Sequence, residues 1–334
     1  MTGRTATARA QVNIALIKYW GKRDERLHLP TNGSLSLTLE GLHTTTTVTF
    51  SPELPTDVFV RDGAERDGEE ARRVGAFLDL VRVEAGLSER ARVVSRNEVP
   101  TAGGLASSAS GFAALAAAAS RAAGLPLDEV ALSCLARRGS GSACRSIYGG
   151  FVEWRRGERP DGRDSHGVQL APESHWENLR LVVSQLSSLP KDRTSRDGMR
   201  DTVRTSPFYP GWLATVDADL ALARAAIAAR DLEALGEVAE RNALKMHATM
   251  LGAVPAFTYW MPASLAAMQA VWQLRREGVP AWFTMDAGPH VKVVTEEAQL
   301  ARVSAALTAT PGVERVRVCS PGGGLRWLNE PLQP

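Results

Sequence analysis

The sequence Asn97-Glu-Val-Pro-Thr-Ala-Gly-Gly-Leu-Ala-Ser-Ser-Ala-Ser110 lies between a short β-like run at 91–95 and an alanine-rich run at 111–120. The first run predicts a strand. The second predicts a helix, because alanine has the highest helix propensity. The first amides of a helix lack partners within it and point toward any anion placed there. Strand, glycine-hydroxyl turn and helix together therefore predict a phosphate-binding loop.

Within this loop, Gly103 and Gly104 would let the backbone approach an anion closely. Ser107, Ser108 and Ser110 can donate hydrogen bonds to phosphate oxygens, and one of them could hold a magnesium ion. The same pattern also fits an ordinary helix start with a serine cap. It is not a Walker A loop, because no Lys-Ser or Lys-Thr follows the glycines.

Length and composition indicate an ordinary soluble globular protein. The chain has 334 residues, of which 44% are apolar and 23% charged, enough for two domains. A net charge of +2 gives no reason to expect nucleic-acid or membrane partners. Three cysteines without C-x-x-C spacing favour a reducing cytoplasm over a disulfide framework. The polar, basic N-terminus does not resemble a signal peptide.

Two further segments concentrate donors for anions. Lys18-Tyr-Trp-Gly-Lys-Arg23 follows a predicted strand at 8–16, and its cations suit phosphate or carboxylate. A surface loop with a buried aromatic explains it equally well. The run 137–150 holds two glycine-serine pairs flanked by Arg138 and Arg145, and predicts a second anion site. An ordinary connecting loop rarely gathers so many donors.

The remaining periodicity predicts two α+β halves with a cleft between them, the phosphate loop in the first and Asp286 in the second. Asp286 alone also fits a turn residue before Ala-Gly-Pro, and His247 fits a helix-terminal or a core histidine. The charged loop 190–198 is expected to be mobile, and 321–324 to be a flexible turn. Strands are expected at 35–39, 44–50, 151–154, 179–184 and 291–294, and helices at 69–84, 129–136, 217–229, 232–250 and 264–277.

The motif Pro100-x-x-Gly-Gly-Leu-x-Ser-Ser-Ala109 resembles the phosphate loop of the galacto-, homoserine, mevalonate and phosphomevalonate (GHMP) kinase superfamily. The residues of this motif are most similar to those of diphosphomevalonate decarboxylases. Segments 13–24, 138–146 and 283–289 resemble other motifs of that family, as do 198–207 and 242–249, so the resemblance covers most of the chain. Departures are His290, where the family commonly has asparagine, and Thr194-Ser-Arg-Asp197.

The resemblance implies an α+β GHMP kinase fold with two-layer halves and a cleft between them. Residues 1–180 would form an ATP-binding domain like the second domain of ribosomal protein S5. Residues 181–334 would form a ferredoxin-like domain.

The family's reaction is the ATP-dependent decarboxylation of mevalonate 5-diphosphate in isoprenoid biosynthesis. ATP phosphorylates the tertiary 3-hydroxyl, and loss of that phosphate and of carbon dioxide gives isopentenyl diphosphate. The resemblance thus implies ATP and Mg²⁺ as cofactors and a cytoplasmic homodimer. A mevalonate 3-kinase, a decarboxylase of the monophosphate and a noncatalytic nucleotide-binding protein are alternatives on the same scaffold.

The resemblance also implies roles for individual residues. Asp286 would be the base, Arg145 the clamp on the substrate carboxylate, and Lys18 a third catalytic residue. The other substrate contacts would come from Tyr19, Lys22, Arg73, Ser140, Ser142 and Arg196. ATP would be bound by Ser95, Pro100, Gly103, Gly104, Leu105, Ala106, Ser107, Ser108 and Ser195, with Ser107 as the magnesium ligand.

Overall fold

The structure is a computed structural model that describes residues 4–98, 107–186 and 193–333. Its N-terminal domain is built on an eight-stranded sheet in the order β14-β1-β4-β7-β5-β6, with β8 paired to β4 and β9 to β8. The strands of this sheet are β1 (Arg4–Ile17), β4 (Ser34–Ser51), β5 (Val58–Arg61), β6 (Ala64–Arg66), β7 (Arg90–Asn97), β8 (Phe151–Trp154), β9 (Gly167–Ala171) and β14 (Arg326–Leu328). The other elements are the hairpin β2 (Lys22–Asp24) and β3 (Leu29–Pro30), helices α1 (Gly68–Ala85), α2 (Ser107–Ala122) and α3 (Glu129–Gly139), and the 3-10 helices η1 (Gly141–Ile147) and η2 (Glu173–Trp176).

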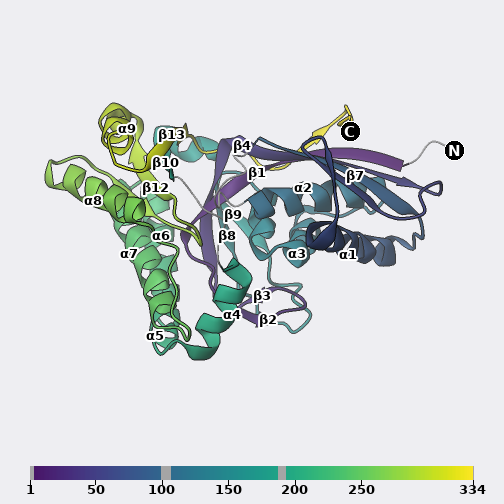
Figure 1. The fold of residues 1–334 in the computed structure, drawn as a ribbon, viewed down its shortest axis with the longest axis horizontal. Coiled ribbons are helices and arrows are strands. Elements are labelled where there is room, and N and C mark those ends of the chain that lie inside the picture. Colours follow the sequence, from purple (N-terminus) through teal and green to yellow (C-terminus); the bar gives the residue numbers. More distant parts are fainter. Residues whose placement is uncertain (1–3, 99–106, 187–192, 334) are drawn as a thin grey trace.

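Helix α2 is the central packing element of this domain (Figure 1). Its alanines from 113 to 119 are fully buried, because their small side chains let the helix lie close to the sheet and to its neighbouring helices. Strand β4 is one strand of 18 residues, where two separate strands were expected. A register shift opposite β1 and the left-handed Gly41, at φ +80°, accommodate the irregularity without ending the strand.

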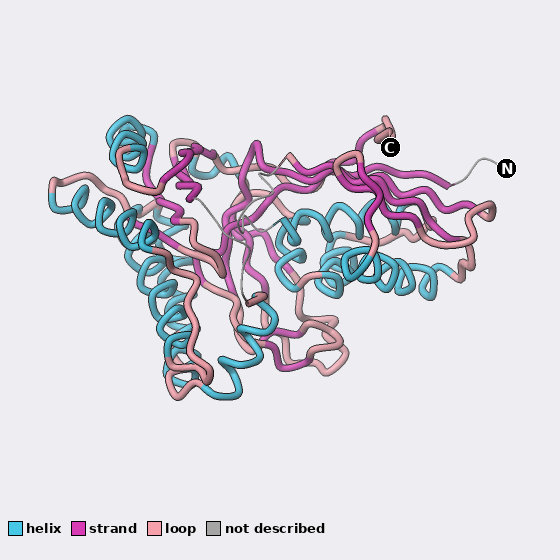
Figure 2. Tube along the Cα trace, in the orientation of Figure 1, coloured by secondary structure: helices cyan, strands magenta, loops and turns pink. Residues whose placement is uncertain are grey.

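The C-terminal domain has a four-stranded sheet in the order β11-β12-β10-β13, packed against long helices (Figure 2). The predicted helices at 217–229, 232–250 and 264–277 are present with ends shifted by one or two residues. The strands are β10 (Leu179–Leu186), β11 (Trp282–Thr284), β12 (Val291–Glu296) and β13 (Val313–Cys319). The helices are α4 (Ser195–Thr205), α5 (Tyr209–Leu213), α6 (Val216–Ala229), α7 (Leu232–Leu251), α8 (Pro262–Arg276) and α9 (Leu300–Thr308), with the 3-10 turn η3 (Glu297–Gln299).

One apolar core joins the two domains. It contains Ile14 and Leu16 of β1, Leu37 of β4, Val183 of β10 and Leu235 of α7, all fully buried. Burial on this scale fixes the relative position of the domains, since loosely linked domains share smaller and more polar contacts. None of the helices in the described residues is both long and apolar enough to cross a membrane.

In the described residues, two segments expected to be loops are more constrained than expected. Helix α4 begins at Ser195, inside the loop expected to be mobile, and the Thr194 side chain caps it by accepting a hydrogen bond from the Asp197 amide. The glycine turn at 321–324 is tied down, because the Gly322 amide donates to the Thr38 carbonyl. The chain then enters β14, which pairs with β1 in the first domain. We therefore propose that the N-terminal domain includes the last residues of the chain as well as 4–180.

Candidate active site

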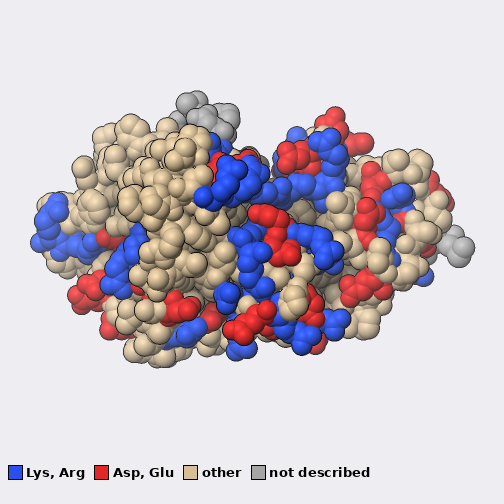
Figure 3. Space-filling view, turned by 90° about the horizontal axis from the view of Figure 1, so that it is seen from below, with Lys and Arg blue, Asp and Glu red and all other residues tan. Residues whose placement is uncertain are grey.

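A cleft of about 710 Å³ lies between the domains and takes its lining from β1, the β2–β3 hairpin, α1, η1, α4 and the segment after β11. Lysine and arginine side chains gather around the middle of the face shown in Figure 3. The predicted site residues that line the cleft are Lys18, Tyr19, Lys22, Arg73, Ser108, Ser140, Ser142, Arg145, Ser195, Arg196 and Asp286.

Asp286 lies in the segment between β11 and β12 with two ammonium groups beside it. Lys18 donates to Asp286 Oδ1 at 2.8 Å, and Lys292 Nζ lies 3.0 Å from Asp286 Oδ2. Burial favours the neutral carboxyl, yet the charges of Lys18 and Lys292 outweigh it and hold the pKa of Asp286 well below its ordinary value. Asp286 is therefore ionised at neutral pH. Its side chain is 23% exposed and opens onto the cleft.

Lys18 follows β1 and is fixed through its backbone as well as its side chain. Its amide donates to Asn242 Oδ1 of α7, and its carbonyl accepts from Asn32 Nδ2, both at 2.8 Å. Burial and the charge of Lys292 lower the pKa of Lys18 to about 8, although Asp286 opposes the shift. Asn242 in turn donates to the buried Asp219 at 2.8 Å.

Sequence reasoning did not assign roles to Lys292, Asn242 or Asp219. In the sequence, Lys292 is an ordinary position of a predicted strand and Asp219 an ordinary polar position of a predicted helix, so neither stands out. The only signal for Asn242 was its place at the start of the motif 242–249.

Arg145 of η1 is buried, with 2% of its surface exposed. Its Nε donates to Asn13 Oδ1 at 3.1 Å and to Ser36 Oγ at 2.9 Å, and its Nη1 donates to Ser34 Oγ at 2.5 Å. Burial lowers the pKa of Arg145, but a guanidinium remains charged at neutral pH. Three neutral acceptors thus orient a cation that has no carboxylate partner among its hydrogen bonds in the described residues. Such an arginine suits an anionic ligand.

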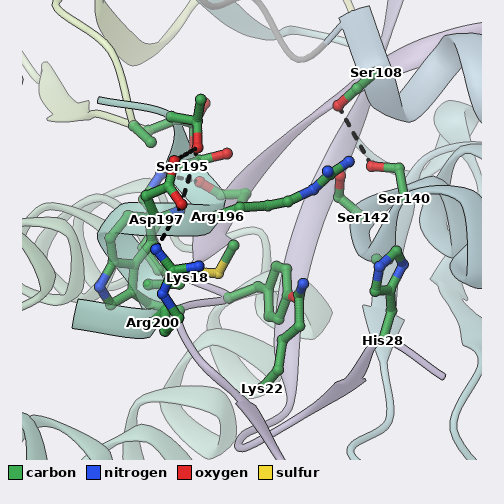
Figure 4. Close-up of a pocket in the computed structure, with 18 of the residues that line it drawn as sticks. Lys18, Lys22, His28, Ser108, Ser140, Ser142, Ser195, Arg196, Asp197 and Arg200 are labelled. Carbon is green, nitrogen blue, oxygen red and sulfur yellow. Dashed lines mark hydrogen bonds and ion pairs between the residues drawn. The ribbon is translucent and has the colours of Figure 1, made fainter. Parts of the chain in front are cut away.

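Tyr19 and the serines of 140–142 form the wall next to Arg145. The Tyr19 ring packs on Trp154 with centroids 4.7 Å apart. Only glycine fits at position 141, because a Cβ there would lie 2.8 Å from Trp154 and 3.0 Å from the Tyr19 hydroxyl. The Oγ atoms of Ser108 and Ser140 are 3.4 Å apart (Figure 4). Helix α2 and η1 therefore meet at hydroxyl groups.

Lys22 and Arg196 are two further cations of the cleft lining. Lys22 pairs with Glu25 at 2.5 Å, and Arg196 of α4 lies 4.0 Å from Glu69 of α1. Figure 4 shows Arg196 reaching from α4 toward Ser142, with Lys22 and His28 below it. His28 was missed from the sequence, where nothing separates it from other hairpin residues. Burial and the charge of Lys22 lower the pKa of His28 to about 4.

A second cavity of about 400 Å³ adjoins the cleft and shares Glu69, Arg73 and Ser108 with it. The predicted ATP residue Ser95 lines this cavity, between β4, β7, α1 and α2. The predicted loop residues Pro100, Gly103, Gly104, Leu105 and Ala106 lie outside the described residues. For Ser107 only the backbone is described, as the first residue of α2.

The donor chemistry here fits a magnesium ion held mainly by phosphates. Mg²⁺ prefers oxygen ligands and usually takes several of them from substrate phosphates and water. In the described residues no group of three or more His, Cys, Asp or Glu side chains could form a protein cage for a metal. The hydroxyl of Ser108, at the start of α2 and in the lining of the adjoining cavity, matches that chemistry.

His290 does not line the cleft. It is buried under β10, and its Nδ1 accepts a hydrogen bond from the Leu186 amide at 3.1 Å. His247 is also buried, with its ring 5.3 Å from that of Trp260, which confirms it as a core histidine.

The fold and the cationic cleft with its ionised Asp286 carboxylate define an enzyme that acts on an anionic small molecule. Two protein-family models match the sequence. The model for the diphosphomevalonate decarboxylase-like N-terminal domain matches residues 10–167, and the model for the mevalonate 5-diphosphate decarboxylase C-terminal domain matches residues 181–317. The chain therefore belongs to the diphosphomevalonate decarboxylase family.

Individual relatives agree over nearly the full length. The diphosphomevalonate decarboxylase of Candida albicans is 36% identical, covering 98% of this chain and 99% of its own. The mevalonate diphosphate decarboxylase of Staphylococcus aureus superposes with a TM-score of 0.93 at 44% identity, covering 97% of this chain and 98% of its own. A complex of a relative with MVAPP, AMPPCP and magnesium gives a TM-score of 0.92 at 48% identity, with the same coverage. The expected two-domain α+β fold and the expected enzyme class are confirmed.

Proposed function

We propose that this chain catalyses the ATP-dependent decarboxylation of mevalonate 5-diphosphate through phosphorylation of its 3-hydroxyl. One observation carries the proposal: the ionised Asp286 of the second domain and the buried Arg145 of the first line the same cleft. A carboxylate can orient and deprotonate a hydroxyl, and the guanidinium can hold the substrate carboxylate. The cationic mouth then takes the diphosphate.

In the first step Asp286 orients the tertiary hydroxyl toward the γ-phosphate of ATP and accepts its proton. A carboxylate paired with Lys18 and Lys292 is a weak base. It therefore takes the proton late, once the new O–P bond has formed and made the hydroxyl more acidic. Because the transition state of phosphoryl transfer is loose, the rate depends little on the strength of the base and mainly on how the reactants are positioned.

In the second step the 3-phosphate leaves with the C–O electron pair. The electrons of the breaking C–C bond to the carboxylate form the new double bond, and carbon dioxide departs. Arg145 holds the carboxylate in the orientation that aligns these two bonds. Asn13, Ser34 and Ser36 fix the guanidinium, so the clamp is organised before the substrate arrives.

The nucleotide is assigned to the adjoining cavity, with its phosphates at the start of α2. Ser107 would hold the magnesium ion, and Ser108 would donate to phosphate. The metal supplies neutralisation of phosphate charge during transfer. Arg73 lines both cavities and thus lies where nucleotide and substrate would meet.

We also propose a cytoplasmic homodimer. The unpaired Cys134, Cys144 and Cys319 support a reducing compartment. Light scattering on the purified protein measures the dimer, and a single monomeric mass at micromolar concentration would refute it.

An assay with three substrates tests the reaction. Mevalonate 5-diphosphate, its monophosphate and mevalonate are each supplied with ATP and magnesium, and ADP and carbon dioxide are measured together. We expect both products in equal amounts from the diphosphate. ADP without carbon dioxide would indicate a 3-kinase, preference for the monophosphate would indicate the sister decarboxylase, and neither product would indicate a noncatalytic protein.

The diphosphate pocket gives a first prediction. Lys22→Ala is expected to raise the KM for mevalonate 5-diphosphate about tenfold, the effect of losing one hydrogen bond to a charged group, and to leave the KM for mevalonate nearly unchanged. Glu25→Gln is the matched variant. It frees Lys22 from its carboxylate partner, so the KM for the diphosphate is expected to fall. Equal effects of Lys22→Ala on both substrates would place the diphosphate elsewhere.

The phosphate loop gives a second prediction. Ser107→Ala and Ser108→Ala each remove a hydroxyl assigned to ATP phosphates or magnesium. We expect kcat/KM for ATP to fall roughly 10- to 150-fold in each, equivalent to about 1.5–3 kcal/mol. Ser133→Ala, a buried serine that donates to the Cys144 carbonyl, is the control. Unchanged ATP kinetics in both loop variants would remove the loop from the mechanism.

A further inference from the structure

The centre around Asp286 holds more positive charge than its own carboxylate balances. Lys18 and Lys292 contribute two ammonium groups against one carboxylate, and both lysine side chains are almost fully buried, at 2% and 0% exposed. Burying a cation costs several kcal/mol unless it is paired and hydrogen-bonded. Lys18 alone would already neutralise Asp286. The second cation therefore needs a reason beyond folding.

The position of Lys292 follows from the sheet. Strand β12 runs antiparallel to β11 with Lys292 opposite Thr284, the last residue of β11. This register places Lys292 beside the chain segment from which Asp286 emerges. Its ammonium lies behind Asp286 and is not part of the cleft lining. It is within ion-pairing distance of Oδ2, yet in the described residues its geometry satisfies no hydrogen bond.

Among the described residues, no other charged or titratable group that acts on this centre pairs with Asp286 Oδ2. Lys18, after β1, holds Oδ1 and the Ala15 carbonyl. Arg145 of η1 is bound to Asn13, Ser34 and Ser36. Burial lowers the pKa of His247 of α7 to about 3, so its ring is neutral.

We propose that Lys292 is a positioning residue for the reaction: it fixes the second oxygen of Asp286, so that the carboxylate stays ionised and faces the substrate hydroxyl. The proposal rests on the proposed function of Asp286. The excess cation also leaves the centre with a net positive charge. That charge is suited to the negative charge that develops as the phosphate and carboxylate react.

Lys292→Met tests the proposal, because it keeps length and volume and leaves a neutral Lys18–Asp286 pair. We expect kcat to fall about 10- to 100-fold while the KM for mevalonate 5-diphosphate stays within about threefold. The charge of Lys292 lowers the pKa of both Asp286 and Lys18. Its removal is expected to move the acid and alkaline limbs of the pH–kcat profile together, to higher pH by about one unit or more.

Arg82→Met is the matched control. Arg82, near the C-terminal end of α1, is a buried cation paired with Asp79 of the same helix and with Asp57, which precedes β5. Its loss should lower the melting temperature and leave both limbs in place. If Lys292→Met does not fold, Lys292→Gln retains a donor without the charge and is expected to move the limbs in the same direction. Wild-type kcat in the variant, or lower activity with unmoved limbs, would overturn the proposal.

A titration separates this proposal from the proposed function. The side-chain carboxyl carbon of Asp286, observed by carbon-13 NMR in the wild-type protein, is expected to show no protonation down to pH 4. Protonation near the ordinary aspartate value of about 4 would overturn the ion pair whatever the activity. A wild-type protein that released neither ADP nor carbon dioxide would refute the proposed function, and this titration would still test the ion pair.

Discussion

Asp286→Asn is expected to lower kcat by about 10²–10⁴-fold, the usual contribution of positioned acid-base catalysis. The amide keeps the shape of the side chain but can neither take the proton nor carry the charge. Substrate binding should not weaken. The variant leaves Lys18 and Lys292 without their counter-ion, so the cleft becomes more attractive to an anion and the KM stays constant or falls. Single-turnover ADP release measures the chemical step.

The competing interpretation makes Asp286 a turn residue before Ala-Gly-Pro. In that case the substitution would lower the melting temperature but spare turnover per folded molecule. Asp57→Asn serves as the control, since it removes another ion-paired carboxylate, the partner of Arg82. We expect the control to lose stability and keep its turnover. An Asp286→Asn protein with wild-type single-turnover rate would end the catalytic assignment.

Arg145→Gln is expected to lower kcat/KM for mevalonate 5-diphosphate roughly 30- to 5000-fold. The range corresponds to about 2–5 kcal/mol for removing one partner of a buried, hydrogen-bonded charge pair. Asn13, Ser34 and Ser36 would still surround the site, but a neutral amide cannot balance the substrate carboxylate. Because that carboxylate leaves in the second step, the decarboxylation should suffer more than the phosphorylation. The measurement is the ratio of carbon dioxide to ADP in a single turnover.

A fall in that ratio is the specific sign of the clamp. Arg275→Gln is the control, because Arg275 also pairs with a largely buried carboxylate, Glu240, but lies outside the cleft lining. It should leave the ratio at one. If Arg145→Gln released both products in equal amounts at a reduced rate, Arg145 would contribute to binding only.

The sequence was most informative where a motif combined several unusual residues. Lys18, Arg145 and Asp286 are far apart in the chain, and the structure brings all three to one cleft. Each stands in a segment whose glycines and polar residues fit no ordinary strand or helix. The long helices were predicted for a different reason, since their apolar period persists over several turns.

Residues that act from inside regular elements could not be predicted in this way. Lys292 lies in an apolar strand, and its role depends on the β11–β12 register, which local pattern does not specify. Asn242 is only one of several polar residues in a helix of 20 residues. The packing of α7 against β1 is what shows that its side chain accepts a hydrogen bond from the Lys18 amide. Helix α4 was missed because its charged sequence 195–205 is typical of an exposed loop.

The pairing of Lys18 with Asp286 has a mechanical consequence. One residue belongs to each domain, and the hydrogen bond from Lys18 to Asn242 adds a second buried tie across the same seam. Separating the two domains would leave these buried groups without partners, at a cost of several kcal/mol. The reaction centre therefore helps to hold the two domains in a fixed relative position. Substrates and products are then expected to pass at the rim of the cleft, where the exposed Arg196 and Glu69 lie 4.0 Å apart.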